Sequence, residues 1–251
     1  MPSGMSIDTP DDWHGLRRAA EVARLTLDAL EAAVRPGVTT LELDRIAAGV
    51  FAAHGGRSAP AMVYGFPGTV LISLNDEIVH GIPGPRAIAR GDLVKLDVTV
   101  EKDGYIADAA RTVVVEGASE QARRLAAVVR TAFEAGLAVA RAGVKVNEIG
   151  RAVERAVRDA GFAVVRDLSG HGVGRTIHEP PNVPNTYDRR QQDVLTDGLV
   201  ITIEPMISAG TDRIKTAKDG WTIRTADGSP SAHYEHTLVI TTGAPVVLTA
   251  A

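Results

Sequence analysis

The chain has 251 residues, of which 45% are hydrophobic and 23% are charged, as is typical of globular proteins. Its formal net charge is −4, which argues against a globally basic surface for nucleic acid. It contains no cysteine, which excludes disulfides, thiolate zinc sites and cysteine nucleophiles. The sequence shows neither a signal-peptide pattern nor an apolar run near the ~20 residues of a membrane span, so we predict a soluble, cytoplasmic protein.

Two capped helices are predicted at the start of the chain. Thr9-Pro10 followed by two acidic residues is typical of a helix start, and apolar residues then recur at helical spacing until Pro36-Gly37. Thr39 and Glu42 form a capping box, and the helix that they open ends at Gly55-Gly56. We therefore expect two consecutive helices before the first strand.

A strand (69–74) and a loop (75–83) lead into a β-hairpin that is predicted from Val94 to Thr112. Apolar and polar residues alternate along its first strand, and Asp103-Gly104 favours a two-residue type I′ turn. Because the turn has two residues, it determines which residues of the two strands face each other.

In this register Thr99 opposes Asp108, so Asp97 lies on the same face as Asp108 and diagonal to it. The two carboxylates are then roughly 7–8 Å apart at the backbone and repel each other unless a cation lies between them. Opposed strands can place such carboxylates around metal ions ~3.5–4 Å apart. The alternative is an ordinary solvated polar face.

The second half of the chain repeats the order of helices followed by strands. It is predicted to contain helices over 119–142 and 147–160, a loop over 169–181, and strands over 199–204 and 234–241. Three glycines argue against a helix around His171, so this imidazole is expected on a loop. Glu204 ends an otherwise apolar strand, where a buried charge is costly.

An internal duplication is predicted from the similarity of the two halves. Residues 35–56 and 141–162 share six identities in 22 positions at an offset of 106. At an offset of 107, the segment GDLVKLD lies against GLVITIE, which places Asp97 on Glu204. We expect a single catalytic domain over 1–251, with an internal pseudo-repeat at approximately 11–115 and 119–251.

Five polar residues from both halves form a candidate metal site. Four carboxylates carry about four negative charges, which two divalent ions would neutralise, and without cations some of their pKa values would rise strongly. One imidazole among oxygen ligands suits Mn(II), Fe(II), Co(II) or Zn(II). Surface and capping roles are the alternative for each acid. The five residues are Asp97, Asp108, His171, Glu204 and Glu235.

Three further histidines lie close to this set in the sequence. His80 and His178 are expected on loops, from which they could donate hydrogen bonds to a substrate. Exposed loop histidines without a role are the alternative. His236 faces away from Glu235 on a strand, so we interpret it as structural or solvent-facing.

Several blocks together resemble one enzyme family. The segments NDEIVHGIP, KLDVTVEKDGYIADAART, SGHGVGRTIHEPP, ITIEPMI and KDGWTIRTADGSPSAHYEHT are similar to the signature blocks of type 1 methionine aminopeptidases. The resemblance implies the α+β pita-bread fold, in which two pseudo-symmetric halves with an antiparallel sheet flanked by helices surround a dinuclear metal centre. It also implies that the five candidate residues are the metal ligands.

The resemblance further implies a hydrolase that removes the initiator methionine from nascent proteins and favours a small second residue. Glu204 would then transfer a proton, while His178 and His80 would contact the substrate. Two divalent ions (Co, Mn, Fe or Zn) would be bound, and N-terminal methionyl peptides would be the substrates. The chain is expected to be a monomer, in transient proximity to the ribosome, with no nucleic acid or membrane as partner. The methionine pocket would include Tyr64, Phe66, Ile177 and Trp221.

Two alternatives remain at this point. Proline-specific aminopeptidases and prolidases share the fold and the kind of ligand set, but they resemble longer chains with a separate N-terminal domain that is not expected here. A non-catalytic pita-bread binding protein would have lost its ligands.

The sequence departs from the family pattern at Ala109-Ala110, where a hydroxyl residue usually follows Asp108, so a hydrogen bond that supports the metal site could be missing.

Overall fold

The computed structural model describes residues 5–250, and its first two helices begin at the predicted caps. Thr9 Oγ1 accepts a hydrogen bond from the Asp12 N–H, and Asp12 in turn accepts one from the Thr9 N–H. Thr39 and Glu42 form the same reciprocal pair. The helices are α1 (Pro10–Ala33), α2 (Thr40–His54), α3 (Ala59–Tyr64), α4 (Glu120–Val139) and α5 (Val146–Asp159).

The predicted hairpin is confirmed in its register and in its turn. Thr99 pairs with Asp108, and Asp97 pairs with Ala110. Asp103 and Gly104 have φ angles of 53° and 84°, and positive φ at both central residues defines a type I′ turn. Strands from the first half of the chain are β1 (Arg57–Ser58), β2 (Leu71–Leu74), β3 (Glu77–Val79), β4 (Leu93–Lys102) and β5 (Tyr105–Val114).

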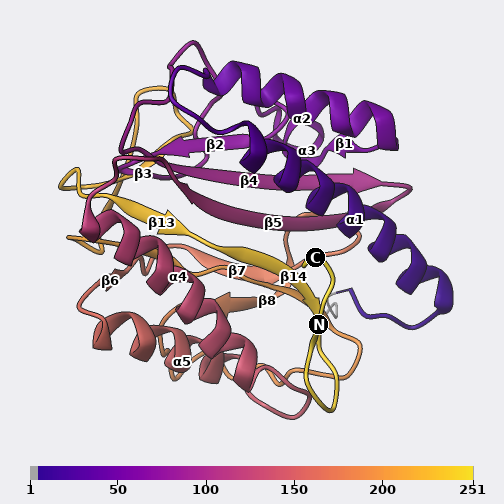
Figure 1. Cartoon of the computed structure of the whole chain (residues 1–251). Coiled ribbons are helices and arrows are strands. Elements are labelled where there is room, and N and C mark those ends of the chain that lie inside the picture. Colours follow the sequence, from indigo (N-terminus) through magenta and orange to yellow (C-terminus); the bar gives the residue numbers. More distant parts are fainter. Residues whose placement is uncertain (1–4, 251) are drawn as a thin grey trace.

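One large antiparallel sheet joins the two halves of the chain. Its strands follow the order β1-β4-β5-β14-β9-β7-β8, so β5 and β14 meet at the centre, as Figure 1 shows. The remaining strands are β6 (Ala163–Val164), β7 (Ser169–Gly172), β8 (Glu179–Pro184), β9 (Val200–Ile203), β10 (Met206–Ser208), β11 (Ile214–Thr216), β12 (Ile223–Thr225), β13 (Ser231–His233), β14 (Glu235–Val239) and β15 (Val246–Val247).

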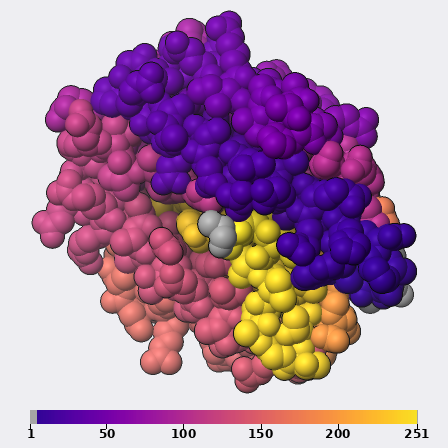
Figure 2. Space-filling model, turned by 45° about the vertical axis from the view of Figure 1, so that its right-hand side comes forward, coloured from indigo at the N-terminus to yellow at the C-terminus, as the bar shows by residue number. Residues whose placement is uncertain are grey.

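The helices cover the sheet in two pairs. Apolar residues of α1 and α2 form one buried cluster with β4, and those of α4 and α5 form another with β9 and β14. In Figure 2 the C-terminal residues, in yellow, come to the surface between the indigo and the magenta parts of the chain. The predicted α+β class is confirmed, whereas the origin of the two halves as a pseudo-repeat stays a prediction. Among residues 5–250, no helix has the length and hydropathy needed to cross a bilayer.

The predicted loop over 169–181 is wrong at both of its ends, where β7 and β8 form a strand pair. The glycines allow strands to approach closely here. A Cβ on Gly170 would lie 2.6 Å from the carbonyl oxygen of Thr202, and a Cβ on Gly172 would lie 2.3 Å from that of Pro180. His171 is therefore held on a sheet strand and not on a loop.

Candidate metal centre

All the side chains that the sequence singled out as ligands or substrate contacts line one cavity of about 340 Å³. The cavity brings together residues from segments that are far apart in the sequence. The predicted metal ligands in its wall are Asp97, Asp108, His171, Glu204 and Glu235. The predicted substrate contacts in its wall are Tyr64, Phe66, His80, Ile177, His178 and Trp221.

Three adjacent strands supply the acidic part of the cavity. Asp97 on β4 and Glu235 on β14 both pair with Ala110, which lies between them on β5. Directly paired residues of antiparallel strands direct their side chains to the same face. The two carboxylates therefore flank a methyl group, and Asp108 joins them from a position two residues before Ala110 on β5.

Threonine hydroxyls orient the residues that are predicted to bind metal. Thr99 Oγ1 donates a hydrogen bond of 2.9 Å to Asp108 Oδ1. Thr202 Oγ1 donates to Glu204 Oε1 at 2.9 Å and accepts the His171 N–H at 3.1 Å. These partners leave the other carboxylate oxygens free to face the cavity, as is usual for residues that support metal ligands.

Burial and mutual repulsion disfavour the charged forms of three of the acids. Burial and then the neighbouring carboxylates raise the pKa values of Asp97 and Glu235 well above their ordinary values. Burial likewise raises the pKa of Asp108 to about 6. A bound cation would reverse this effect, because it favours the charged carboxylates.

His171 and Glu204 stabilise each other across the cavity. His171 Nε2 lies 3.2 Å from Glu204 Oε1. Burial alone would lower the pKa of His171, but the hydrogen bond and charge of Glu204 outweigh it and raise this pKa to about 9. Burial alone would raise the pKa of Glu204. The hydrogen bond and charge of His171 outweigh this effect, so the pKa of Glu204 lies below its ordinary value.

The donor set fits a divalent metal. Ligand atoms of Asp108, His171 and Glu235 all lie within 4.8 Å of one another, and those of Glu204, His233 and Glu235 do the same. Within residues 5–250, the buried Oε1 atom of Glu235 has no hydrogen-bond partner. An unpaired buried carboxylate oxygen is costly, and a metal ion would satisfy it.

His80 and His178 lie on loops, as predicted, and border the ligand cluster. The ring of His178 is centred 4.3 Å from that of His171, and its Nδ1 lies 2.6 Å from the Tyr64 hydroxyl oxygen. Burial lowers the pKa of His178 to about 4, and it lowers the pKa of His80 as well. Both imidazoles are therefore neutral near pH 7 and can each donate one hydrogen bond.

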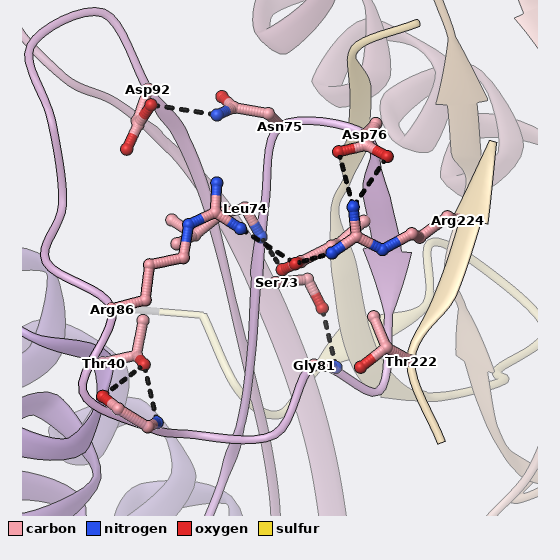
Figure 3. Close-up of polar contacts among 12 residues, drawn as sticks. Thr40, Ser73, Leu74, Asn75, Asp76, Gly81, Arg86, Asp92, Thr222 and Arg224 are labelled. Atoms are coloured by element: carbon pink, nitrogen blue, oxygen red, sulfur yellow. Dashed lines mark hydrogen bonds and ion pairs between the residues drawn. The ribbon is translucent and has the colours of Figure 1, made fainter. Parts of the chain in front are cut away.

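The sequence did not point to the polar network that holds the His80 loop. His80 has a φ of 60°, which is uncommon for a residue with a side chain. Just before it, the buried Glu77 carboxylate accepts hydrogen bonds from the Leu74 N–H and from two guanidinium groups. Figure 3 shows these groups, Arg86 and Arg224, approaching from opposite sides. The network ties β3 to β12, and it thereby connects the His80 loop to the segment that carries Trp221.

The apolar part of the cavity contains predicted and unpredicted residues. Phe66 and Trp221 make an edge-to-face contact with ring centroids 5.3 Å apart, and Ile177 is a buried residue of the same cavity wall. Leu71, Val79, Leu168 and Met206 also line the cavity and were not predicted. They lie on or beside short strands whose apolar residues gave no sign of which side faces a cavity.

His236 has a structural role, which is one of the two roles, structural or solvent-facing, that the sequence predicted for it. Its ring is buried against Phe133, and its Nδ1 lies 2.8 Å from Thr249 Oγ1. It therefore takes no part in the cavity. His233, which the sequence reasoning missed, is the histidine of this segment that faces the ligands: its Nε2 lies 3.6 Å from Glu235 Oε2.

Comparisons with known proteins agree on one family. The model of metallopeptidase family M24 matches residues 14–242. The chain is 42% identical over 234 residues to methionine aminopeptidase from Clostridium perfringens, a match that covers 93% of this chain and 94% of that protein. It is similar to the crystal structure of methionine aminopeptidase from Rickettsia prowazekii, with a TM-score of 0.94, 35% identity, and coverage of 98% of this chain and 100% of that chain.

A more distant structure shares the fold. Prolidase from Pyrococcus furiosus has a TM-score of 0.78 and 23% identity, and the match covers 97% of this chain and 65% of that chain. At this identity the likeness concerns the fold alone. The predicted pita-bread fold is thus confirmed.

Proposed function

The chain belongs to metallopeptidase family M24, and we propose that it is a metal-dependent aminopeptidase that removes the N-terminal methionine from nascent proteins. The observation that carries this proposal is the convergence of the acidic cluster and two neutral histidines in one cavity beside an apolar wall. Such a cavity can hold a metal-activated water, a peptide bond and an apolar side chain at the same time.

Two divalent ions are the proposed cofactors, and Co, Mn, Fe or Zn suits the mixture of carboxylates and imidazole. When bound, the ions supply a nucleophilic water whose pKa is lowered toward neutrality. The residues that would hold them are Asp97, Asp108, His171, Glu204 and Glu235.

Three side chains act on the scissile peptide in this proposal. Glu204 accepts the proton of the nucleophilic water and passes it to the leaving amine. His178 donates a hydrogen bond to the carbonyl oxygen, on which negative charge develops, and His80 contacts the substrate amide. Because both histidines are neutral, each offers an N–H without bringing a positive charge toward the ions.

The apolar wall accounts for the choice of methionine. An unbranched thioether side chain adapts well to a pocket of mixed aromatic and aliphatic groups. Tyr64, Phe66, Ile177 and Trp221 are the proposed contacts of this side chain. The limited volume of the cavity is consistent with a small second residue, which has to pass the loops that carry His80 and His178.

Hydrolysis of short peptides with defined metals tests this function. The metal-free protein is loaded with Co(II), Mn(II), Fe(II) or Zn(II) and incubated with Met-Ala-Ser and with Xaa-Pro peptides. We expect release of methionine from Met-Ala-Ser alone. Asp108→Asn should lose this activity, whereas Asp227→Asn, which alters an exposed turn away from the cavity, should keep it.

The same assay separates the other candidate functions. Preferential cleavage of Xaa-Pro peptides would show a proline-specific enzyme, and cleavage of neither peptide with any metal would show a binding protein. The cytoplasmic location, the monomeric state and transient proximity to the ribosome belong to the proposal as well. The location and the proximity to the ribosome follow from the nascent chain as the proposed substrate.

A further inference from the structure

His233 is a buried imidazole without a hydrogen-bond partner, next to the proposed metal ligands. It ends β13, and Thr112 fixes its backbone: the His233 N–H donates to Thr112 Oγ1 at 2.9 Å, while this hydroxyl donates to the His233 carbonyl oxygen at 2.8 Å. Its ring is 1% exposed. Within the described part of the chain, neither Nδ1 nor Nε2 of His233 has a partner.

The separations around Nε2 are those of ligands that share an ion. Nε2 lies 3.6 Å from Glu235 Oε2 and 3.8 Å from Glu204 Oε2. Both separations exceed the 2.7–3.2 Å of an N–H···O hydrogen bond. Two ligand atoms at about 2.1 Å from one ion lie roughly 3.4 Å apart across a tetrahedral angle and further apart across a wider one.

An ion at this point would also remove two unfavourable features of the cavity. A buried polar atom without a partner is costly, and both Nε2 of His233 and Oε1 of Glu235 are in this position. We propose that His233 is a metal ligand, which supplies a second imidazole to the centre by binding the ion held between Glu204 and Glu235. This inference rests on the proposed function, since it assigns a further ligand to the same metal centre.

A second imidazole changes which metals the centre prefers. Imidazole suits Zn(II), Fe(II) and Co(II), whereas Mn(II) prefers carboxylate and water oxygens. With His233 as a ligand, the site between Glu204 and Glu235 would prefer Zn(II), Fe(II) or Co(II) over Mn(II). This preference would be stronger than that of a site made of the carboxylates and His171 alone. Replacing His233 should reduce this preference.

Proton NMR of the Co(II)-loaded protein counts the imidazole ligands directly. The N–H proton of an imidazole bound to Co(II) gives a strongly shifted resonance that disappears in D₂O. We expect two such resonances from the wild-type protein, from His171 and His233, and one from His233→Gln. His54 is exposed and lies outside the cavity, so the control variant His54→Gln should keep both resonances.

Isothermal titration of the metal-free proteins provides a second measurement. Loss of a partner that only supports a ligand weakens metal binding by about 10–100-fold. For a lost ligand we expect His233→Gln to bind Co(II) at least about 100-fold more weakly than the wild type, with a smaller loss for Mn(II). His54→Gln should bind both metals like the wild type.

Two results would overturn the proposal. One is a single exchangeable shifted resonance in the wild-type protein. This result does not depend on whether any variant folds. The other is the persistence of both resonances in His233→Gln. The proposed function fails separately, because it requires methionine release by the wild-type protein; a protein with two bound imidazoles and no peptidase activity would refute the function and keep the ligand.

Discussion

Replacing Lys95 by methionine should change how the stability of the metal-free protein depends on pH. Lys95 lies on β4 on the same face as Asp97, and its side chain is fully buried. Its Nζ donates a hydrogen bond of 2.7 Å to the carbonyl oxygen of Asn75. Burial lowers the pKa of Lys95 from 10.5 to about 7, although the charge of Glu77 opposes this effect. Methionine keeps the length of the side chain and removes the titration.

The size of the effect follows from the two pKa values. Between pH 7 and 10.5 the unfolded chain holds a proton on Lys95 that the folded protein has released. The free energy of unfolding therefore rises with pH across this interval, by up to 1.36 kcal/mol per pH unit, and falls as the pH returns toward 7. From pH 7.5 to 9.5 the contribution of Lys95 is about 2.5 kcal/mol.

Urea unfolding at these two pH values, with a chelator present, measures the difference. The increase in the free energy of unfolding from pH 7.5 to 9.5 should be larger in the wild type than in Lys95→Met by about 2.5 kcal/mol. All other titrating groups are common to both proteins and cancel in this comparison. Equal increases would refute the reasoning, because they would mean that the folded protein keeps Lys95 charged.

Four further outcomes are expected. Thr99→Val removes the hydroxyl donor of Asp108 and should weaken metal binding about 10–100-fold in titration calorimetry; an unchanged Kd would contradict this. Glu77→Gln should lower kcat/KM at least about tenfold at full metal occupancy, because the His80 loop loses its ion pairs, whereas Glu116→Gln in an exposed pair should not. His178→Ala should lower kcat about 10²-fold, and a wild-type kcat would remove its role. Metal at 100 times its Kd should stabilise the protein by about 2.7 kcal/mol, and no rise in Tm would argue against binding to the folded state.

Features set by neighbouring residues could be predicted from the sequence. The caps at Thr9 and Thr39 need only a partner three residues away, and the register of Asp97 and Asp108 follows from one two-residue turn. The position of His171 could not be predicted in this way. Its strand exists because the adjacent glycines let β7 lie against β8 and β9, which come later in the chain.

The face on which His233 and Lys95 lie could also have been predicted from the sequence. Residues two apart on a strand share a face. Lys95 precedes Asp97 by two residues, and His233 precedes Glu235 by two. The same alternation that turns His236 away from the cavity therefore places Lys95 and His233 on the face of the two acids. The short break between β13 and β14 at Tyr234 preserves this relation. What the sequence could not supply was their burial, which depends on the packing of both halves.

The Ala109-Ala110 pair, where we expected that a hydrogen bond supporting the predicted metal site could be missing, does not leave Asp108 without a hydroxyl partner. The side chain at 109 cannot assist Asp108, since Ala109 pairs with Val98 and packs in the apolar cluster on the opposite face. Thr99 from the facing strand already supplies a hydroxyl to the Asp108 carboxylate. Ala110 lies on the cavity face between Asp97 and Glu235, and its methyl group is the smallest side chain that keeps the strand regular there. A hydroxyl at 109 is therefore not needed to orient the Asp108 carboxylate, whereas the residue at 110 shares the cavity face with Asp97 and Glu235.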